Sequence, residues 1–180
     1  MSGARGHHGL LLAGGGGGAY ATAVSWVPSL TSGGWSGYTV RIRLVAAQML
    51  AGSKVRLTVD STGQPLNMGA MYCQVRNMAG DLYDFESAPI AVTFGGSGTI
   101  ATASGTVYVS DDIPLVQTAT KDLIISAYFN STTTMQRTGT VTGLSHFYKS
   151  GGNDAATVNA TGYSAQTHAV MVTKVEIFQP

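Results

Sequence analysis

The residues of this 180-residue chain that come closest to a catalytic motif are serines near glycine. In many hydrolases the nucleophilic serine occupies a G-x-S-x-G motif, at a sharp turn between a strand and a helix. Ser36, Ser97 and Ser164 each follow a glycine by two positions, but the final glycine of the motif is missing. The surrounding residues are typical of β-turns. These serines are therefore not expected to act as nucleophiles.

A serine nucleophile also needs a histidine as its general base. His7 and His8 precede the first expected strand, His146 lies beside Phe147 in an expected strand, and His168 just precedes the last one. No local spacing among these residues supports a catalytic triad. We therefore predict no catalytic residues, and a protein that is not an enzyme.

Acidic residues gather in two places where oxygen ligands could bind a hard cation such as calcium. Asp81, Asp84 and Glu86 lie in the segment GDLYDFE, and Asp111 and Asp112 are adjacent. Their spacing matches no defined calcium loop, and aspartate is a common turn residue. We interpret them as turn formers and predict no metal and no other cofactor.

Aromatic side chains in loops indicate a different kind of site. Exposed rings stack on the faces of sugars, because they combine a flat apolar surface with polar edges. Six aromatic residues fall in or beside expected loops and are candidates for contacting a glycan: Trp26, Trp35, Tyr38, Tyr83, Tyr148 and Tyr163. The alternative is that the two tryptophans anchor the segment WVPSLTSGGW to the surface of the domain.

The composition excludes some partners and limits the chemistry of cysteine. Charged residues make up 11% of the chain, well below the usual 25% or so, and the formal net charge is +1. A chain with so little positive charge is not expected to bind nucleic acid. The low charge suits a surface that partners cover. Cys73 is the single cysteine, which excludes an internal disulfide.

Alternating apolar residues predict β-strands. In TVRIRLV and KVRLTVD, one face carries valine, isoleucine and leucine, and Arg41, Arg43 and Arg56 lie on the opposite, exposed face. The nearly continuous apolar run DLIISAYF predicts a central strand covered on both faces. Many short strands separated by turns predict an all-β protein, an antiparallel β-sandwich or jelly roll. Further strands are expected at residues 70–75, 90–94, 106–109, 123–129, 145–148 and 169–178.

The start of the chain, MSGARGHHGLLLAGGGGGAYA, is unusual. Its apolar run is too short for a signal peptide, no segment is long enough to span a membrane, and no Lys-Ser or Lys-Thr follows the glycines as in a phosphate-binding loop. We expect residues 1–37 to form an extended arm and a draped segment, followed by a sandwich at residues 38–180. The residues expected to contact neighbouring subunits are Leu10, Leu11, Leu12, Gly14, Gly15, Gly16, Gly17, Gly18 and Tyr20.

The ordered set TVRIRLV, KVRLTVD, PIAVTFGGSGTI and DLIISAYF resembles a known accessory domain. It is similar to the β-sandwich that precedes the catalytic domain in a group of bacterial and phage-encoded SGNH (GDSL-type) hydrolases. The resemblance covers about residues 39–129. No Gly-Asp-Ser block and no terminal Asp-x-x-His are present, so the catalytic residues of that family have no counterparts here.

The resemblance implies one of two roles for a sandwich without its enzyme. The first is a non-enzymatic structural component of a phage or phage-like particle, a capsid-surface decoration or tail subunit located in the virion. Its arm would contact copies of itself and other virion proteins. The alternative is a secreted bacterial carbohydrate-binding module that contacts a surface glycan. The glycine-rich arm favours the first role, because glycines let backbones approach closely. Neither role involves nucleic acid or membrane insertion.

Overall fold

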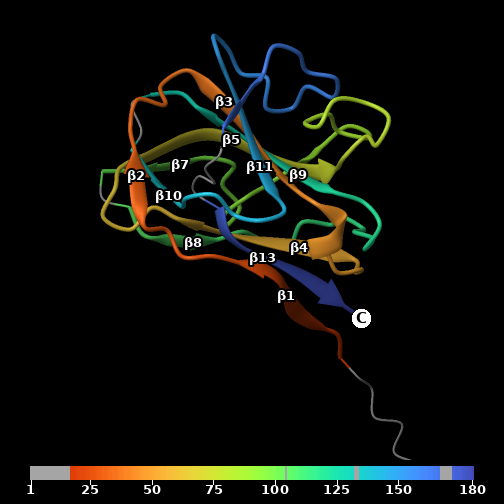
Figure 1. Ribbon diagram of the computed structural model, residues 1–180. Helices are drawn as coiled ribbons and strands as arrows, with labels where there is room; N and C mark the ends of the chain where they lie inside the picture. The colour runs from red at the N-terminus through yellow and green to blue at the C-terminus, as the bar shows by residue number, and fades with distance from the viewer. Residues whose placement is uncertain (1–16, 104, 132–133, 167–171) are drawn as a thin grey trace, which may run out of the picture.

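The protein is an all-β antiparallel sandwich (Figure 1). The computed structural model describes residues 17–103, 105–131, 134–166 and 172–180, so Leu10, Leu11, Leu12, Gly14, Gly15 and Gly16 lie outside the described residues. Within them, the single helical element is a 3₁₀ turn, η1 (Ala46–Gln48), which opens the connection between two strands. No described helix is long and apolar enough to cross a membrane.

Two large sheets form the body of the molecule, and a two-stranded sheet accompanies them (Figure 1). The four-stranded sheet has the order β1 (Ala19–Ser25), β13 (Val172–Gln179), β4 (Lys54–Asp60) and β8 (Val107–Val109). The seven-stranded sheet has the order β12 (Ser164–Gln166), β11 (Leu144–Ser150), β3 (Tyr38–Leu44), β9 (Leu123–Phe129), β5 (Leu66–Val75) and β6 (Ile90–Ala91), with β7 (Ile100–Thr102) also paired to β5. The small sheet pairs β10 (Met135–Arg137) with β2 (Leu30–Ser32).

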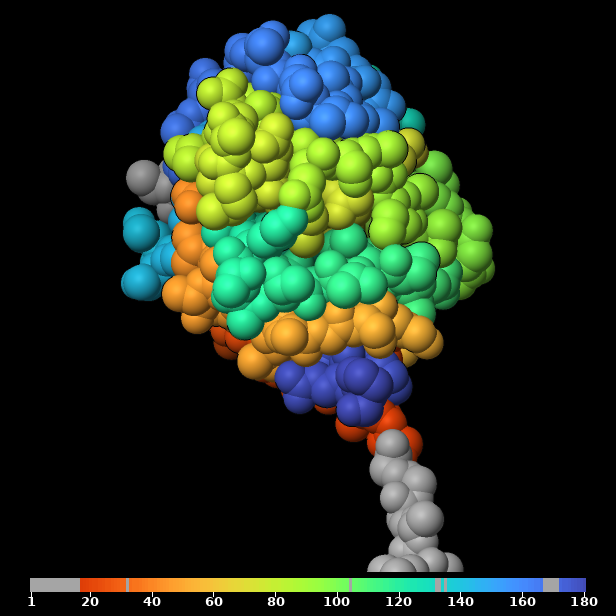
Figure 2. All heavy atoms as spheres, turned by 90° about the vertical axis from the view of Figure 1, so that its right-hand side faces the viewer, coloured from red at the N-terminus to blue at the C-terminus, as the bar shows by residue number. Residues whose placement is uncertain are grey.

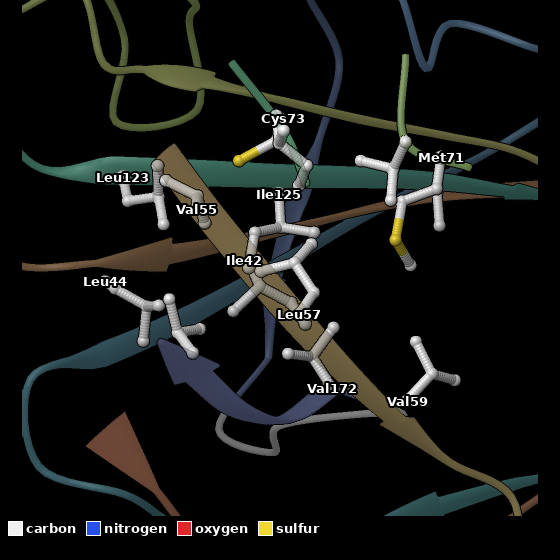
Figure 3. Close-up of a cluster of buried hydrophobic side chains, with 14 of the residues drawn as sticks. Ile42, Leu44, Val55, Leu57, Val59, Met71, Cys73, Leu123, Ile125 and Val172 are labelled. Carbon is white, nitrogen blue, oxygen red and sulfur yellow. The ribbon is translucent and has the colours of Figure 1, made fainter. Parts of the chain in front are cut away.

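The main core lies between the two large sheets. The alternating residues of β3 and β4 point into it, as predicted, and all six are fully buried: Val40, Ile42, Leu44, Val55, Leu57 and Val59. Figure 3 shows side chains from both sheets meeting in this layer, with Cys73 among them. Burial raises the pKa of the Cys73 thiol, so this cysteine packs as an apolar residue.

The outer face of the seven-stranded sheet is also covered, by loops from residues 76–89 and 151–163. These loops lie side by side in Figure 2, coloured yellow-green and blue, and the Phe85 N–H donates to the Val158 carbonyl at 3.1 Å. Beneath them β9 is buried on both faces, which confirms the prediction for DLIISAYF. Five buried apolar residues lie outside the main core cluster: Phe85, Ile124, Phe147, Ala155 and Ala160.

Arg41 is fully buried under these loops, so its predicted exposure is wrong. Its side chain does face away from the main core, as the alternation of β3 requires. Its guanidinium donates to the carbonyls of Tyr83 at 2.6 Å, Asp154 at 2.9 Å and Thr157 at 2.5 Å, and stacks 4.4 Å from the Phe85 ring centroid. Burial lowers the pKa of Arg41. The arginine therefore links both loops to the sheet.

The β structure begins earlier than residue 38, where the sequence analysis placed the start of the sandwich. β1 is an edge strand of the four-stranded sheet and pairs with β13 through six residue pairs. Tyr20, expected to contact a neighbouring subunit, packs within this sheet: its ring centroid lies 5.3 Å from that of Phe178 and 3.9 Å from the Arg56 guanidinium carbon. Residues 19–25 are therefore part of the sandwich.

Candidate functional site: an aromatic hollow beside β3 and β11

A tight turn places Trp35 at the start of β3. The Tyr38 N–H donates to the Trp35 carbonyl at 3.4 Å, and Gly37 has a φ of +72°, a conformation that glycine adopts without steric cost. The Gly37 N–H bonds the Phe129 carbonyl at 2.8 Å, which holds the turn against the end of β9. The GGWSGY segment thus folds the indole back toward the core, where Trp35 is 5% exposed.

Two tyrosines from neighbouring strands complete an aromatic cluster with Trp35. Tyr38 begins β3 and Tyr148 lies on β11, and both pack against the main core. The Trp35 ring centroid lies 5.5 Å from that of Tyr38 and 6.1 Å from that of Tyr148, both in edge-to-face geometry. The two tyrosine centroids are 6.2 Å apart. Aromatic rings favour such edge-to-face contacts, so the three rings stabilise one another.

These rings line an open hollow of about 280 Å³. Gly33 and Gly34 form another part of its wall, and Gln166, at the end of β12, adds a carboxamide. A Cβ atom at Gly34 would meet nothing within 4 Å, so the backbone there borders open space. The described lining therefore combines aromatic rings, open backbone and one uncharged polar side chain, and we call this depression the aromatic hollow.

Only three of the six candidate glycan contacts meet in the aromatic hollow. Tyr83 and Tyr163 lie in the two loops that cover Arg41, with ring centroids 4.8 Å apart. The Arg41 guanidinium carbon is 5.2 Å from the Tyr163 ring centroid. Burial raises the pKa of Tyr163 to about 12. Trp26 packs against the main core, and its backbone N–H donates to the Thr173 carbonyl at 2.9 Å. Trp26 therefore anchors its segment to the core. Trp35 is buried as well, but it also lines the hollow.

The acidic residues of GDLYDFE do not converge. Asp84 is buried and accepts a hydrogen bond from the Asp81 N–H at 2.9 Å, while Glu86 pairs with Lys121. No group of three histidine, cysteine or acidic side chains in the described part of the chain has the arrangement of a metal site. These residues shape the loop that covers Arg41.

Asp111 and Asp112 have separate structural partners. Asp111 accepts hydrogen bonds from the Thr93 hydroxyl at 2.5 Å and from the N–H groups of Gly96 and Gly95, and these bonds lower its pKa. It therefore holds the FGGSG turn. Asp112 instead faces β4, where Arg56 donates to it at 2.6 Å.

The candidate serines and histidine have no catalytic arrangement in the described residues. His146 is fully buried beneath Trp35, with ring centroids 5.8 Å apart. The Ser97 hydroxyl donates to the Thr99 carbonyl within its own turn, and Ser36 and Ser164 are exposed. His7, His8 and His168 lie outside the described residues. Among the described residues, the hollow thus offers surfaces for binding a ligand, and none of these residues pairs a nucleophile with a base.

Sequence reasoning missed three of the hollow's six residues. Gly33 and Gly34 had a local signal, since a glycine pair before a tryptophan predicts a turn that exposes backbone. No local sequence signal marked Gln166, because its position in the hollow depends on the pairing of β12 with β11, where Gln166 lies opposite His146. Two further glycines of the expected arm are described. Gly17 is exposed, and Gly18 lies against Phe178.

A second hollow, of about 160 Å³, lies on the seven-stranded sheet beside β5 and β6. Its walls include Gly69, Ala70, Tyr72 and Ala91, with a single aromatic ring among them. It lacks converging side chains of the kind that orient a ligand.

Comparison with known proteins leaves the family open. The chain matches no model of a known protein family, and it has no significant match among curated protein sequences. The function is therefore inferred from the fold and from the aromatic hollow.

Proposed function

We propose that the protein is a non-enzymatic, carbohydrate-binding β-sandwich whose binding site is the aromatic hollow. The observation that carries the proposal is the convergence of Trp35, Tyr38 and Tyr148, from a loop and two strands, on one open depression whose described lining carries no charge. Ring edges and faces of this kind suit the mixed polar and apolar surface of a sugar. Binding sites are typically concave and carry a few polar groups that orient the ligand.

The resemblance to accessory sandwiches of SGNH hydrolases supports the same role. The mutual ring contacts of the hollow also favour binding, because side chains already held in place lose little conformational entropy when the ligand arrives. In this role the protein acts outside the cell, secreted from a bacterium or carried on a particle.

A printed glycan array tests this proposal, with Tyr148→Ala as the diagnostic variant. We expect the wild-type protein to bind a subset of glycans and Tyr148→Ala to lose that binding. Tyr108→Ala is the matched control, since Tyr108 is also half-buried against the main core and contacts an aromatic residue, Phe94, away from the hollow. Circular dichroism checks that both variants fold. An empty array, or equal binding by the two variants, would overturn the proposal.

A structural role in a phage or phage-like particle is the second candidate, and the four-stranded sheet supplies its observation. Val107 and Val109 on the edge strand β8 are 51% and 50% exposed. Soluble proteins usually protect an edge strand with charge, proline or a covering segment, since an open edge can pair with another chain. Apolar residues at such an edge favour contact with a second copy.

Sedimentation of wild-type protein and variants tests the structural role. We expect self-association that Val109→Lys weakens, while Val116→Lys leaves it unchanged, because Val116 is equally apolar and 69% exposed but lies outside the strands. Deleting residues 2–18, the part of the expected arm before β1, is predicted to preserve the fold and reduce association. A protein that stays monomeric at all concentrations would contradict this role.

A further inference from the structure

The aromatic hollow has the capacity for a small ligand. Its volume is about 280 Å³, just below the range of roughly 300–1,000 Å³ typical of sites for drug-sized molecules. Its described lining comes from three aromatic residues, two glycines and Gln166, and polar atoms make up most of the exposed surface. The volume leaves room for about one sugar ring to lie against the aromatic wall, with the rest of a glycan outside.

The charge around the hollow restricts which sugar can enter. None of the six described residues that line it is charged. The nearest charges along β3 and β11 belong to Arg41 and Lys149, whose positions alternate with those of Tyr38 and Tyr148 and so face the opposite side of the sheet. Arg41 binds loop carbonyls there, and Lys149 pairs with Asp154. A carboxylate in the hollow would therefore lose water without gaining a cation, which is unfavourable.

Gln166 is the side chain of the hollow that can form paired hydrogen bonds with the hydroxyl groups of a sugar. Its carboxamide carries a donor and an acceptor side by side, which matches two neighbouring hydroxyl groups. β12 pairs with β11 so that Gln166 lies opposite His146, on the same face as Tyr148. The Gln166 carboxamide therefore borders the hollow on the same side of the sheet as the Tyr148 ring.

We infer that the aromatic hollow binds one uncharged pyranose ring and that Gln166 determines which hydroxyl pattern it accepts. The inference rests on the proposed function and specifies its ligand. A site that hydrogen-bonds a hydroxyl rejects analogues without that hydroxyl, because its own polar groups would then be left unpaired. The preference is therefore for neutral sugars over acidic ones, with Gln166 as the specificity-determining residue.

Saturation-transfer NMR with single sugars tests the inference. The neutral probes are the methyl glycosides of glucose, galactose, mannose and N-acetylglucosamine, and the acidic probes are glucuronic acid and N-acetylneuraminic acid. We expect at least one neutral probe to bind and neither acidic probe to do so. Gln166→Leu is expected to weaken neutral binding about tenfold or more, the effect of losing a buried hydrogen bond. Gln64→Leu, another half-buried glutamine outside the hollow, is expected to bind as wild type.

Gln166→Glu keeps the shape of the side chain and removes its donor, so it tests the same point in a variant that preserves packing. We expect it to weaken neutral binding as Gln166→Leu does. Stronger binding of an acidic probe, or unchanged binding in both Gln166 variants, would overturn the inference and leave glycan binding standing. If neither these probes nor the glycan array showed binding, the proposed function would fail together with the inference.

Discussion

The rings of Trp35 and Tyr148 meet nearly at right angles, with centroids 6.1 Å apart and an interplanar angle of 89°. The two residues are far apart in the sequence, and they meet because β3 pairs with β11 while the turn before β3 folds the indole back over the pair. The aromatic hollow therefore depends on sheet register, since a shift of one residue would turn Tyr148 to the other face.

Arg41 gives a prediction about the loops on the opposite face. Arg41→Lys removes the planar fork that reaches three carbonyls, and a lysine ammonium cannot reproduce that geometry. We expect amide hydrogen exchange to accelerate in residues 81–86 and 153–163. Exchange in β4, in the other sheet, is the internal control and should change much less. Uniform acceleration across both sheets would show that Arg41 supports the whole fold and not these two loops.

Asp122 gives a prediction about pH. Burial by itself raises the pKa of this carboxyl, but hydrogen bonds from Arg43 at 2.6 Å and from the Ala46 N–H at 2.8 Å outweigh burial, so the pKa is below its usual value of 3.8. A carboxyl with a lowered pKa in the folded state stabilises the fold above its unfolded pKa, and that stabilisation is lost as the pH falls through the folded value. Urea unfolding should therefore show the free energy of unfolding declining below about pH 4.

Asp122→Asn distinguishes the contribution of this carboxyl to the pH dependence of stability from that of the other acidic residues. The variant removes the negative charge shared by Arg43 and Arg76 but keeps an acceptor oxygen, so we expect a loss of about 1–3 kcal/mol at pH 7. Its stability should then depend less on pH between 4 and 2 than that of the wild type. An identical acid profile in both proteins would contradict the role given to Asp122, and it would point to exposed acids such as Asp112, whose pKa is lowered to about 2 by Tyr20, Arg56 and Lys54.

Gly52 gives a prediction about close packing. A Cβ atom there would lie 2.3 Å from the Phe178 carbonyl oxygen and 2.4 Å from Ile177 Cγ2, so Gly52→Ala must displace β13. We expect the free energy of unfolding to fall by about 1–3 kcal/mol. Gly98→Ala is the control, because a Cβ atom there meets nothing within 4 Å, and its effect should stay within about 0.5 kcal/mol. Equal effects of the two substitutions would count against the close approach.

The sequence predicted the strands that carry strong alternation or long apolar runs. Residues 54–60 and 123–129 form β4 and β9 with the expected bounds, because large apolar side chains mark their buried faces. β1 was missed because AYATAVS is built mostly from small residues, whose pairing with β13 depends on the C-terminal strand. β2, β7, β10 and β12 have only three residues each, too few to show a period.

The candidate site was predictable only in part, for a similar reason. The aromatic side chains of Trp35, Tyr38 and Tyr148 indicated a sugar site. The same reasoning also selected Tyr83 and Tyr163, which the fold places in the loops that cover Arg41. Which rings share a hollow depends on long-range strand pairing. The burial of Arg41 was not predictable either, because an alternating strand shows which residues share a face and does not show that loops cover the second face.

The two indole N–H signals of the protein provide the most direct test of the central claim that a glycan binds in the aromatic hollow. Trp26 and Trp35 are the only tryptophans, and Trp26 packs against the main core outside the hollow. In a two-dimensional ¹H–¹⁵N NMR titration with the four neutral methyl glycosides, we expect the Trp35 indole signal to shift in a saturable manner with at least one of them, while the Trp26 signal stays in place. Saturable shifts confined to Trp26, or no shift of Trp35 with any of the four sugars, would contradict the claim.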